Sequence, residues 1–310
     1  MPQSPHIPVL LSQTIASFEG IDEGFFIDCT LGYAGHSQAL LEHFPKAKLI
    51  GIDRDQTAID FATRRLAPFT ERFEAIRADF ASGFARAVAR AGVLNVKGVL
   101  ADIGVSSLQL DKLERGFGFE SDVLDMRMDQ DAALDAYEVV NNYSQSELER
   151  ILREYGELPH ARKLAADIVQ ARPIESAKAL ASLAMRYRGG KKIHPATLLF
   201  QAIRIEVNDE LGQLTSVLDA IEAANFVDTI VSIITFHSLE DRIVKQRFRA
   251  WAQSCICDAQ AMRCTCGNNH ALGVELHRKP QSADSSELAS NPRSRSAKLR
   301  SFRFGARETF

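Results

Sequence analysis

The stretch Asp28-Cys29-Thr30-Leu31-Gly32-Tyr33-Ala34-Gly35-His36-Ser37 is the clearest indication of the fold in this 310-residue chain. An apolar run at 25–27 precedes it and is typical of a buried strand, and residues 38–44 follow it as the start of a helix. Small residues at such a turn let the backbone approach a bound nucleotide closely. A second apolar run, 49–52, ends in Asp53, and a carboxylate at this place usually accepts hydrogen bonds from ribose hydroxyls. The stretch therefore predicts a nucleotide-binding βαβ unit; the alternative is an ordinary glycine turn followed by a helix-capping aspartate.

The residues of the turn also discriminate between nucleotides. Dinucleotide sites place three glycines as G-x-G-x-x-G, so that a helix N-terminus meets a pyrophosphate. Here Thr30 occupies the first of those positions, and Asp28 lies just before it. A carboxylate suits a ligand with cationic amino and sulfonium groups better than it suits a pyrophosphate. The turn therefore favours S-adenosylmethionine over NAD.

The order of predicted elements indicates an α/β fold with an insertion. Strand-like runs at 25–29, 48–52, 72–76 and 97–101 alternate with helical patterns at 35–44, 55–66 and 81–91, which predicts a parallel sheet with right-handed crossovers. The next strand, 229–234, comes about 130 residues later, and a compact domain does not hold that much loop. We expect residues 1–104 and 201–310 to form the cofactor-binding domain. Residues 105–200 are expected to form an inserted helical domain that recognises the substrate.

Composition and charge exclude several classes of protein. The chain is 45% hydrophobic and 25% charged, its net charge is −3, and no apolar run approaches the ~20 residues of a membrane span. Its five cysteines and the lack of a secretory signal predict a protein of the reducing cytoplasm without a membrane segment. Basic residues gather at 186–204 and from His277 onward, whereas 111–157 holds 13 acidic and five basic residues. The basic patches predict a phosphate-binding face or merely a solvated surface.

Further candidate residues follow the other predicted strands. Asp102 ends the fourth strand and is a candidate for the amino group of the methyl donor, with Gln109 reaching the cofactor from the next loop; a capping aspartate in a polar loop is the alternative. Asp79 and Phe80 follow the third strand, where an adenine ring would be gripped, although a phenylalanine there is equally compatible with the core. His237 follows the fifth strand and is a candidate to take a proton or orient a base.

Other predictions concern the neighbourhood of these residues. Ser238 with Asp241 is typical of a helix start. Phe117 and Phe119 are candidates to stack on an unpaired base, with Arg115 and Arg127 on phosphates, against the alternative that the aromatic rings are core.

A cysteine segment lies near the end of the chain. Cys255-x-Cys257 and Cys264-x-Cys266 are candidates to hold a tetrahedral, structural Zn²⁺, and four free thiols are the alternative.

Taken together, these segments resemble one family. The residues that carry the resemblance are, in chain order, His6–Leu11, Asp28–Ser37, Gly51–Asp55, Asp102–Asp111, Arg115–Phe119, Leu124–Asp129, Tyr155–Glu157, His194–Ala196, Phe200–Ile205, Val207–Asn208, Phe236–Lys245 and Asn291–Ala297. The chain resembles the MraW (RsmH) family, S-adenosylmethionine-dependent methyltransferases that modify a cytosine of bacterial small-subunit (16S) ribosomal RNA at its exocyclic N4. The resemblance implies a Rossmann-like class I methyltransferase fold with an inserted helical domain.

The resemblance also implies site residues and partners. The family's cofactor contacts correspond to Ala34, Gly35, His36, Asp53, Phe80, Asp102 and Gln109. The family usually has glycine where this chain has Ala34, and a methyl group is tolerated there if φ is negative. The implied partner is the ribosomal RNA of the assembling or assembled 30S particle, and a homodimer is compatible with the family. The catalytic residue stays open, with His237 and Ser106 as candidates.

Two other functions compete with this interpretation. A DNA amino-methyltransferase is disfavoured because Asp102-Ile103-Gly104-Val105 replaces the Pro-Pro turn common in those enzymes. A nucleotide-binding ribosome-assembly factor without activity would leave the clustered polar strand ends unexplained.

Overall fold

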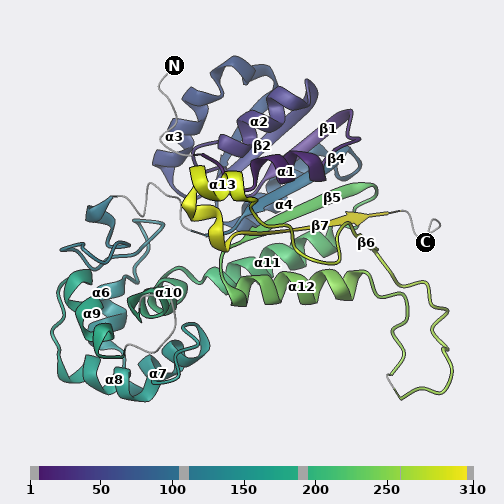
Figure 1. Cartoon of the computed structure of the whole chain (residues 1–310). Helices are drawn as coiled ribbons and strands as arrows, with labels where there is room; N and C mark the ends of the chain where they lie inside the picture. Colours follow the sequence, from purple (N-terminus) through teal and green to yellow (C-terminus); the bar gives the residue numbers. More distant parts are fainter. Residues whose placement is uncertain (1–6, 105–111, 188–194, 259, 306–310) are drawn as a thin grey trace. The chain divides into compact units, whose positions relative to one another are not determined.

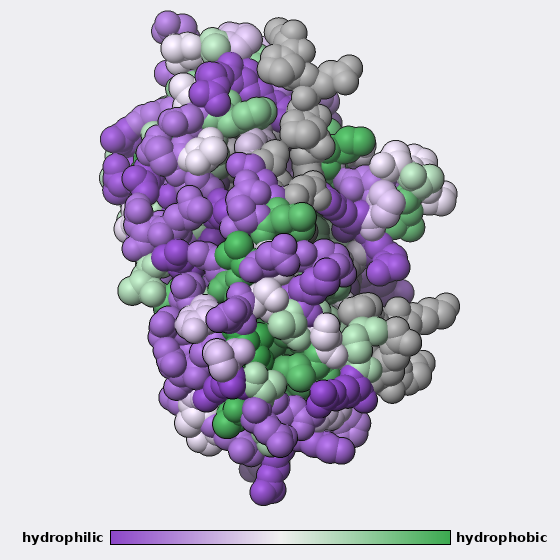
Figure 2. Space-filling model, turned by 90° about the vertical axis from the view of Figure 1, so that its left-hand side faces the viewer, coloured by the Kyte–Doolittle hydropathy of each residue, from purple (hydrophilic) through white to green (hydrophobic). Residues whose placement is uncertain are grey.

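The computed structural model describes residues 7–104, 112–187, 195–258 and 260–305. The chain divides into two compact units, one made of residues 1–104 and 213–310 and the other of residues 105–212. None of the helices in these described ranges is long and apolar enough to cross a membrane. On the face drawn in Figure 2, hydrophilic residues cover most of the surface and hydrophobic residues form small groups among them.

The first unit is built on a seven-stranded sheet (Figure 1). Its strands, in the order in which they lie side by side, are β3 (Phe73–Arg77), β2 (Lys46–Asp53), β1 (Glu23–Asp28), β4 (Val96–Asp102), β5 (Thr229–Thr235), β7 (Lys298–Phe304) and β6 (Gly273–Glu275). The five strands from β3 to β5 are mutually parallel. The last two are antiparallel to their neighbours. The predicted parallel sheet is confirmed, whereas β6 had no counterpart in the sequence interpretation.

Helices cover both faces of this sheet, because successive side chains of a strand point to opposite sides. Phe26, Leu49 and Leu100 pack with α1 (Leu11–Ser17), α2 (Gly35–His43) and α3 (Gln56–Arg65). Their neighbours Ile27, Ile50 and Val99 pack with α4 (Phe80–Ala91), α11 (Glu210–Ala223) and α12 (Ser238–Trp251) on the other face. The short helix α13 (Ser285–Ser290) precedes β7. The carboxyl ends of the parallel strands therefore share one edge, where a doubly wound fold binds its ligand.

The second unit is helical. Its helices are α6 (Ala136–Asn142), α7 (Gln145–Glu154), α8 (Ala161–Gln170), α9 (Ala177–Ala184) and α10 (Pro195–Asn208). Ser144 and Glu147 form a capping box at the start of α7.

The later boundary of this unit corrects the sequence interpretation, which ended the insertion at residue 200. Leu199, Phe200 and Ile203 of α10 lie in the same core as α7, α8 and α9, so the helix belongs to the second unit as a whole. Asp209, whose φ is 49°, ends α10 before α11 begins.

Candidate active site

The turn after β1 is organised by the buried carboxylate of Asp28, which is 2% exposed. Its Oδ1 accepts a hydrogen bond from the Thr30 backbone N–H at 3.0 Å, and its Oδ2 accepts one from the Ser37 hydroxyl at 2.6 Å. The Thr30 hydroxyl in turn accepts a bond from the backbone N–H of Asp102 at 2.6 Å. Burial raises the pKa of Asp28. Asp28 thus joins β1 to α2, while Thr30 joins the turn to β4.

Ala34 does not meet the condition of a negative φ under which a methyl group was expected to be tolerated at this position. Its φ is 58°, in the left-handed region, at the position that precedes α2. An L-residue pays about 1–2 kcal/mol for this conformation. Two backbone bonds hold it, because the Ala34 N–H donates to Leu31 O at 2.7 Å and its carbonyl accepts from the Gln38 N–H at 2.9 Å. The turn keeps the geometry that glycine adopts freely, at the expense of local strain.

Gly35 is required for a different reason, namely close approach. A Cβ added there would lie 2.5 Å from Cγ of Pro8, so the N-terminal segment packs directly on the start of α2. The same segment is bound at three more points: the Leu10 N–H donates to Glu287 Oε1 at 2.6 Å, and Asn291 Nδ2 donates to Ile7 O at 3.0 Å. The third is His36 Nε2, 2.9 Å from Val9 O. We call residues 7–10 the N-terminal strap.

His36 is a neutral side chain between the strap and β4. Burial lowers the pKa of its imidazole to about 4. Since Nε2 donates to the strap, Nδ1 carries the lone pair and lies 3.8 Å from Oδ2 of Asp102. This distance exceeds a hydrogen bond, and a neutral imidazole forms no ion pair. His36 is therefore a positioning residue for the strap.

Asp102, at the end of β4, carries the clearest sign of a missing partner. Its Oδ1 is buried and has no hydrogen-bond partner among the residues that the structure describes. Burial first, and then the charges of Asp28 and Glu240, raise its pKa to about 8. A buried polar atom without a partner costs about 1–3 kcal/mol, so such an atom is normally satisfied by a ligand or water. A cationic group fits this position, since it would satisfy Oδ1 and favour the carboxylate over the protonated form.

Asp53, at the end of β2, is held as a hydrogen-bond acceptor. Its Oδ2 accepts from the Gly32 N–H at 2.8 Å and its Oδ1 from the Asp55 N–H at 2.9 Å. Burial raises the pKa of the carboxyl to about 6, so it is ionised at neutral pH. Each oxygen keeps further lone pairs, which matches the pair of hydroxyls of a ribose.

The candidates for the adenine ring have distinct roles. Phe80 begins α4, is half-buried and packs against the core beneath this end of β3. Asp79 caps the same helix, because its Oδ1 accepts from the Ser82 N–H at 2.9 Å and its Oδ2 from the Ser82 hydroxyl at 2.6 Å. These bonds lower its pKa. Phe80 is thus the better placed of the two for a ring contact. The other two candidates of the next loop, Ser106 and Gln109, lie outside the described residues.

The end of β5 corrects the predicted helix start. His237, not Ser238, caps α12: its Nδ1 accepts from the Glu240 N–H at 3.4 Å. Glu240 Oε2 accepts in return from the backbone N–H groups of Phe236 at 2.8 Å and His237 at 3.2 Å. Asp241 takes no part in the cap, since it binds Arg300 Nε at 2.7 Å, which helps lower its pKa. The Nε2 of His237 lies 3.0 Å from Glu240 Oε1, but neither atom forms a hydrogen bond among the described residues, so the cap bond of Nδ1 is what makes the imidazole a positioning residue.

Glu240 is the functional-site residue that sequence reasoning missed. It is fully buried, and its charge raises the pKa of Asp102. The available signal was a glutamate three residues after a possible cap, the spacing of a capping box. Together with Asp28 and Asp102 it makes the carboxyl ends of β1, β4 and β5 strongly acidic.

The proposed RNA contacts of the second unit are largely internal. Phe117 is 5% exposed in its hydrophobic core, and the ring of Phe119 packs edge-on against Phe200 at 4.8 Å. Arg115, 7% exposed, donates to the carbonyl oxygens of Arg127 and Met128. The Arg127 guanidinium binds both carboxylate oxygens of Asp125. The prediction that Phe117 and Arg115 contact RNA is therefore wrong, because both side chains are buried in the unit's own packing.

The parallel sheet and its acidic strand ends define a Rossmann-like S-adenosylmethionine-dependent methyltransferase. Asp53, a hydrogen-bond acceptor, ends β2, and Asp102, a buried carboxylate with an unsatisfied oxygen, ends β4. The described residues of this turn contain neither the glycine-rich pattern that binds a pyrophosphate nor a basic side chain that would neutralise one.

Comparison with known proteins identifies the family. The MraW methylase family matches residues 3–304, and the chain belongs to that family. A protein of Sulfurovum sp. (strain NBC37-1), named ribosomal RNA small subunit methyltransferase H, is 56% identical over 97% of this chain and 98% of its own length. Proteins of the same name from Sulfurimonas denitrificans and a Nitratiruptor species are 54% and 55% identical, over 96% and 97% of this chain and 97% and 99% of their own lengths.

Proposed function

We propose that this methyltransferase acts on the exocyclic N4 of a cytosine in small-subunit ribosomal RNA, in the assembling or assembled 30S particle in the cytoplasm. The single observation that carries the chemistry is Asp102, a buried carboxylate at the end of β4 with an oxygen lacking a described partner. The RNA substrate is supported by the names of relatives that match this chain over almost its whole length.

The proposed cofactor contacts follow from the geometry. Asp53 accepts hydrogen bonds from the ribose hydroxyls, Phe80 contacts the adenine, and Asp102 binds the cationic amino group. S-adenosylmethionine, when bound, supplies a methyl group on a positively charged sulfur. Ala34 and Gly35 shape the turn, and His36 fixes the strap beside it. The acidic ends of β1, β4 and β5 stabilise the positive charge of the bound molecule.

The residues at the ends of β4 and β5 are proposed to position the cytosine. Its amine is a weak nucleophile because the lone pair is delocalised into the ring. Acceptors near Asp102 and His237 hold the amine hydrogens, which directs the lone pair towards the methyl group. Most of the acceleration then comes from in-line positioning rather than from a strong base. His237, through the cap bond of its Nδ1, acts by holding the start of α12.

The phosphates are proposed to meet basic side chains outside the cofactor turn. Arg186 is exposed and its nearest described acid, Asp167, is 3.8 Å away. Arg293 and Arg295 are also exposed. By contrast, Arg204 is bound to Glu210 at 2.7 Å and is a structural residue. The basic residues at 188–192 belong to the same patch by sequence but lie outside the described ranges.

The four-cysteine segment is not proposed to take part in methyl transfer. A metal held by four thiolates has no open coordination position and serves a structural purpose.

Methyl transfer to immature small subunits tests the proposal. Tritiated S-adenosylmethionine is incubated with small subunits from cells lacking the enzyme and, separately, with naked DNA, and the RNA is digested and analysed for N4-methylcytidine. Label in that nucleoside alone is expected. The Asp102→Asn variant should lose most of the activity, whereas Asp60→Asn, an exposed aspartate of α3, is the matched control and should retain it. Label in DNA, or full activity of Asp102→Asn, contradicts the proposal.

A further inference from the structure

The segment between α12 and β6 has no hydrophobic core of its own. Its described residues, 252–258 and 260–272, form neither helix nor strand, and none of them is buried. Ile256 and Met262 are exposed, Met262 completely. Figure 1 shows this segment as a long excursion of the ribbon away from the sheet. Only the two ends of the described segment, Ala252 and Leu272, pack against the core of the first unit, so the part between them needs another source of order.

The backbone hydrogen bonds that join the two arms of the excursion lie at its base, and the Ala261 N–H to Asp258 O bond of 2.9 Å closes a local turn further out. The Leu272 N–H donates to Trp251 O at 2.7 Å, and the His270 N–H donates to Ser254 O at 3.0 Å. These two bonds bring the two arms of the loop together next to α12. They do not reach residues 257–266, where the chain turns back.

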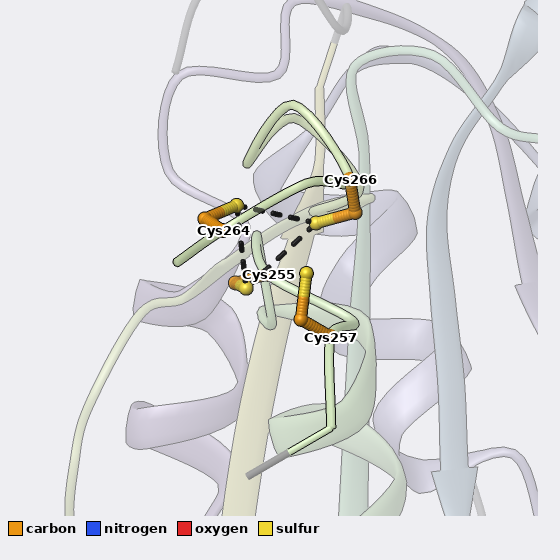
Figure 3. A group of neighbouring side chains, drawn as sticks. All are labelled: Cys255, Cys257, Cys264 and Cys266. Atoms are coloured by element: carbon orange, nitrogen blue, oxygen red, sulfur yellow. Dashed lines mark hydrogen bonds between the residues drawn. The ribbon is translucent and has the colours of Figure 1, made fainter. Parts of the chain in front are cut away.

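Four cysteine side chains converge at that place (Figure 3). The sulfur atoms of Cys255, Cys257, Cys264 and Cys266 all lie within 4.8 Å of one another. Three of their separations are 3.6 Å (Cys255 to Cys264), 3.6 Å (Cys264 to Cys266) and 3.7 Å (Cys266 to Cys255). A tetrahedron of sulfurs at the usual Zn–S distance of ~2.3 Å has edges of about 3.8 Å. These three sulfurs have the spacing of one face of such a tetrahedron, and Cys257 Sγ, within 4.8 Å of each of them, is the candidate for its fourth corner. The three separations are much longer than the ~2.05 Å bond of a disulfide.

The backbone around the sulfurs is arranged to stabilise thiolates. The Ile256 N–H donates to Cys266 Sγ at 3.4 Å, and the Thr265 N–H donates to Cys257 Sγ at 3.2 Å. Each donor lies beside a cysteine of one C-x-C pair and reaches a sulfur of the other pair. Such N–H···S bonds partly offset the net charge of −2 that remains when a divalent cation is bound by four thiolates. The two C-x-C pairs are thus joined by reciprocal N–H···S hydrogen bonds, which free surface thiols do not require.

We propose that these four cysteines bind one Zn²⁺, which takes the place of a hydrophobic core for the 252–272 excursion. Four soft thiolates in a tetrahedron select zinc over harder cations such as Mg²⁺. With all four positions filled by protein, the metal binds no substrate and performs no catalysis. The segment leads into β6, an edge strand that β4, β5 and β7 separate from β1 and β2, which carry the cofactor turn and Asp53.

Metal analysis of the full-length protein, purified without added metal or chelator, is the direct test. Close to one equivalent of zinc is expected in the wild type, and less than a tenth in Cys264→Ser. Met262→Ala is the matched control, because this side chain lies in the same loop, is fully exposed and contacts nothing that the metal needs. It should retain the full equivalent. Cofactor affinity should be unchanged in both variants, which separates this site from the methyl-transfer site.

Limited trypsin digestion supplies a second readout that does not depend on activity. Cleavage between Arg263 and Cys264 should be slow in the metal-loaded protein. It should become at least tenfold faster after chelation and in Cys264→Ser. Iron in place of zinc, disulfides within the segment of protein prepared under reducing conditions, or less than a tenth of an equivalent of any metal in several preparations would overturn the proposal.

Discussion

Replacing Asp102 by asparagine should abolish a proton release that accompanies cofactor binding. With a pKa of about 8, the Asp102 carboxyl is about nine-tenths protonated at pH 7 in the free protein. A cationic amino group bound beside it favours the carboxylate, so binding should release about 0.9 proton. Asp53, with a pKa of about 6, is about one-tenth protonated at pH 7 and contributes little. His36 is already neutral there.

Calorimetric titration with S-adenosylmethionine, in buffers of different ionisation enthalpy, measures this number. The difference between wild type and Asp102→Asn should be about 0.9 proton at pH 7 and about 0.1 at pH 9, because the carboxyl of the free protein is then mostly ionised. The difference removes the contribution of the ligand's own amino group. The variant should also bind about 10–100-fold more weakly, since a charge-assisted hydrogen bond is lost. Equal proton release by both proteins at pH 7 would refute the assignment of Asp102 to the cation.

Three further positions test other parts of the structure. Asp53→Asn should weaken cofactor binding by about 2–3 kcal/mol in calorimetry, because the amide cannot accept both the Gly32 N–H and the ribose hydroxyls; unchanged affinity would remove Asp53 from the site. Ala34→Gly should alter the free energy of unfolding by no more than about 1 kcal/mol, since relief of the left-handed conformation offsets the lost methyl burial and the greater freedom of glycine in the unfolded chain. Ala34→Val should destabilise by more than about 2 kcal/mol in denaturant titration, because a β-branched residue fits neither the φ nor the space. Phe117→Ala should cost about 3–5 kcal/mol of stability, whereas a residue that only stacks on RNA would leave the melting curve unchanged.

The sequence allowed the sheet and the acidic strand ends to be predicted because both depend on local patterns. Apolar runs marked β1, β2 and β4, and the carboxylates that follow them needed no knowledge of distant residues. Antiparallel β6 is only three residues long and depends on its pairing with β7, so no local sequence pattern predicted it. The helical pattern of the sequence continues past residue 200, and it does not indicate whether α10 packs in the core of the first unit or of the second.

Side-chain roles that depend on burial were harder to predict. Phe117 and Arg115 are residue types that are common in RNA-binding loops, and only the structure shows that both side chains are buried within the second unit. His237 and Ser238 are both possible caps, and the choice depends on the backbone angles and on Glu240. The φ of Ala34 likewise follows from the bonds of the whole turn rather than from the residue itself.

The N-terminal strap has a consequence for how the protein is made. Its partner Glu287 is 277 positions later in the sequence than Leu10, and Asn291 is 284 positions later than Ile7. During synthesis the cofactor turn is made first, and the side chains that hold the strap against it are added about 280 residues after the strap itself. A nascent or proteolysed chain that stops before residue 287 contains all the strands from β3 to β5 but lacks both side chains that anchor the strap. The segment beside His36 is therefore the last part of the cofactor turn's surroundings to be fixed.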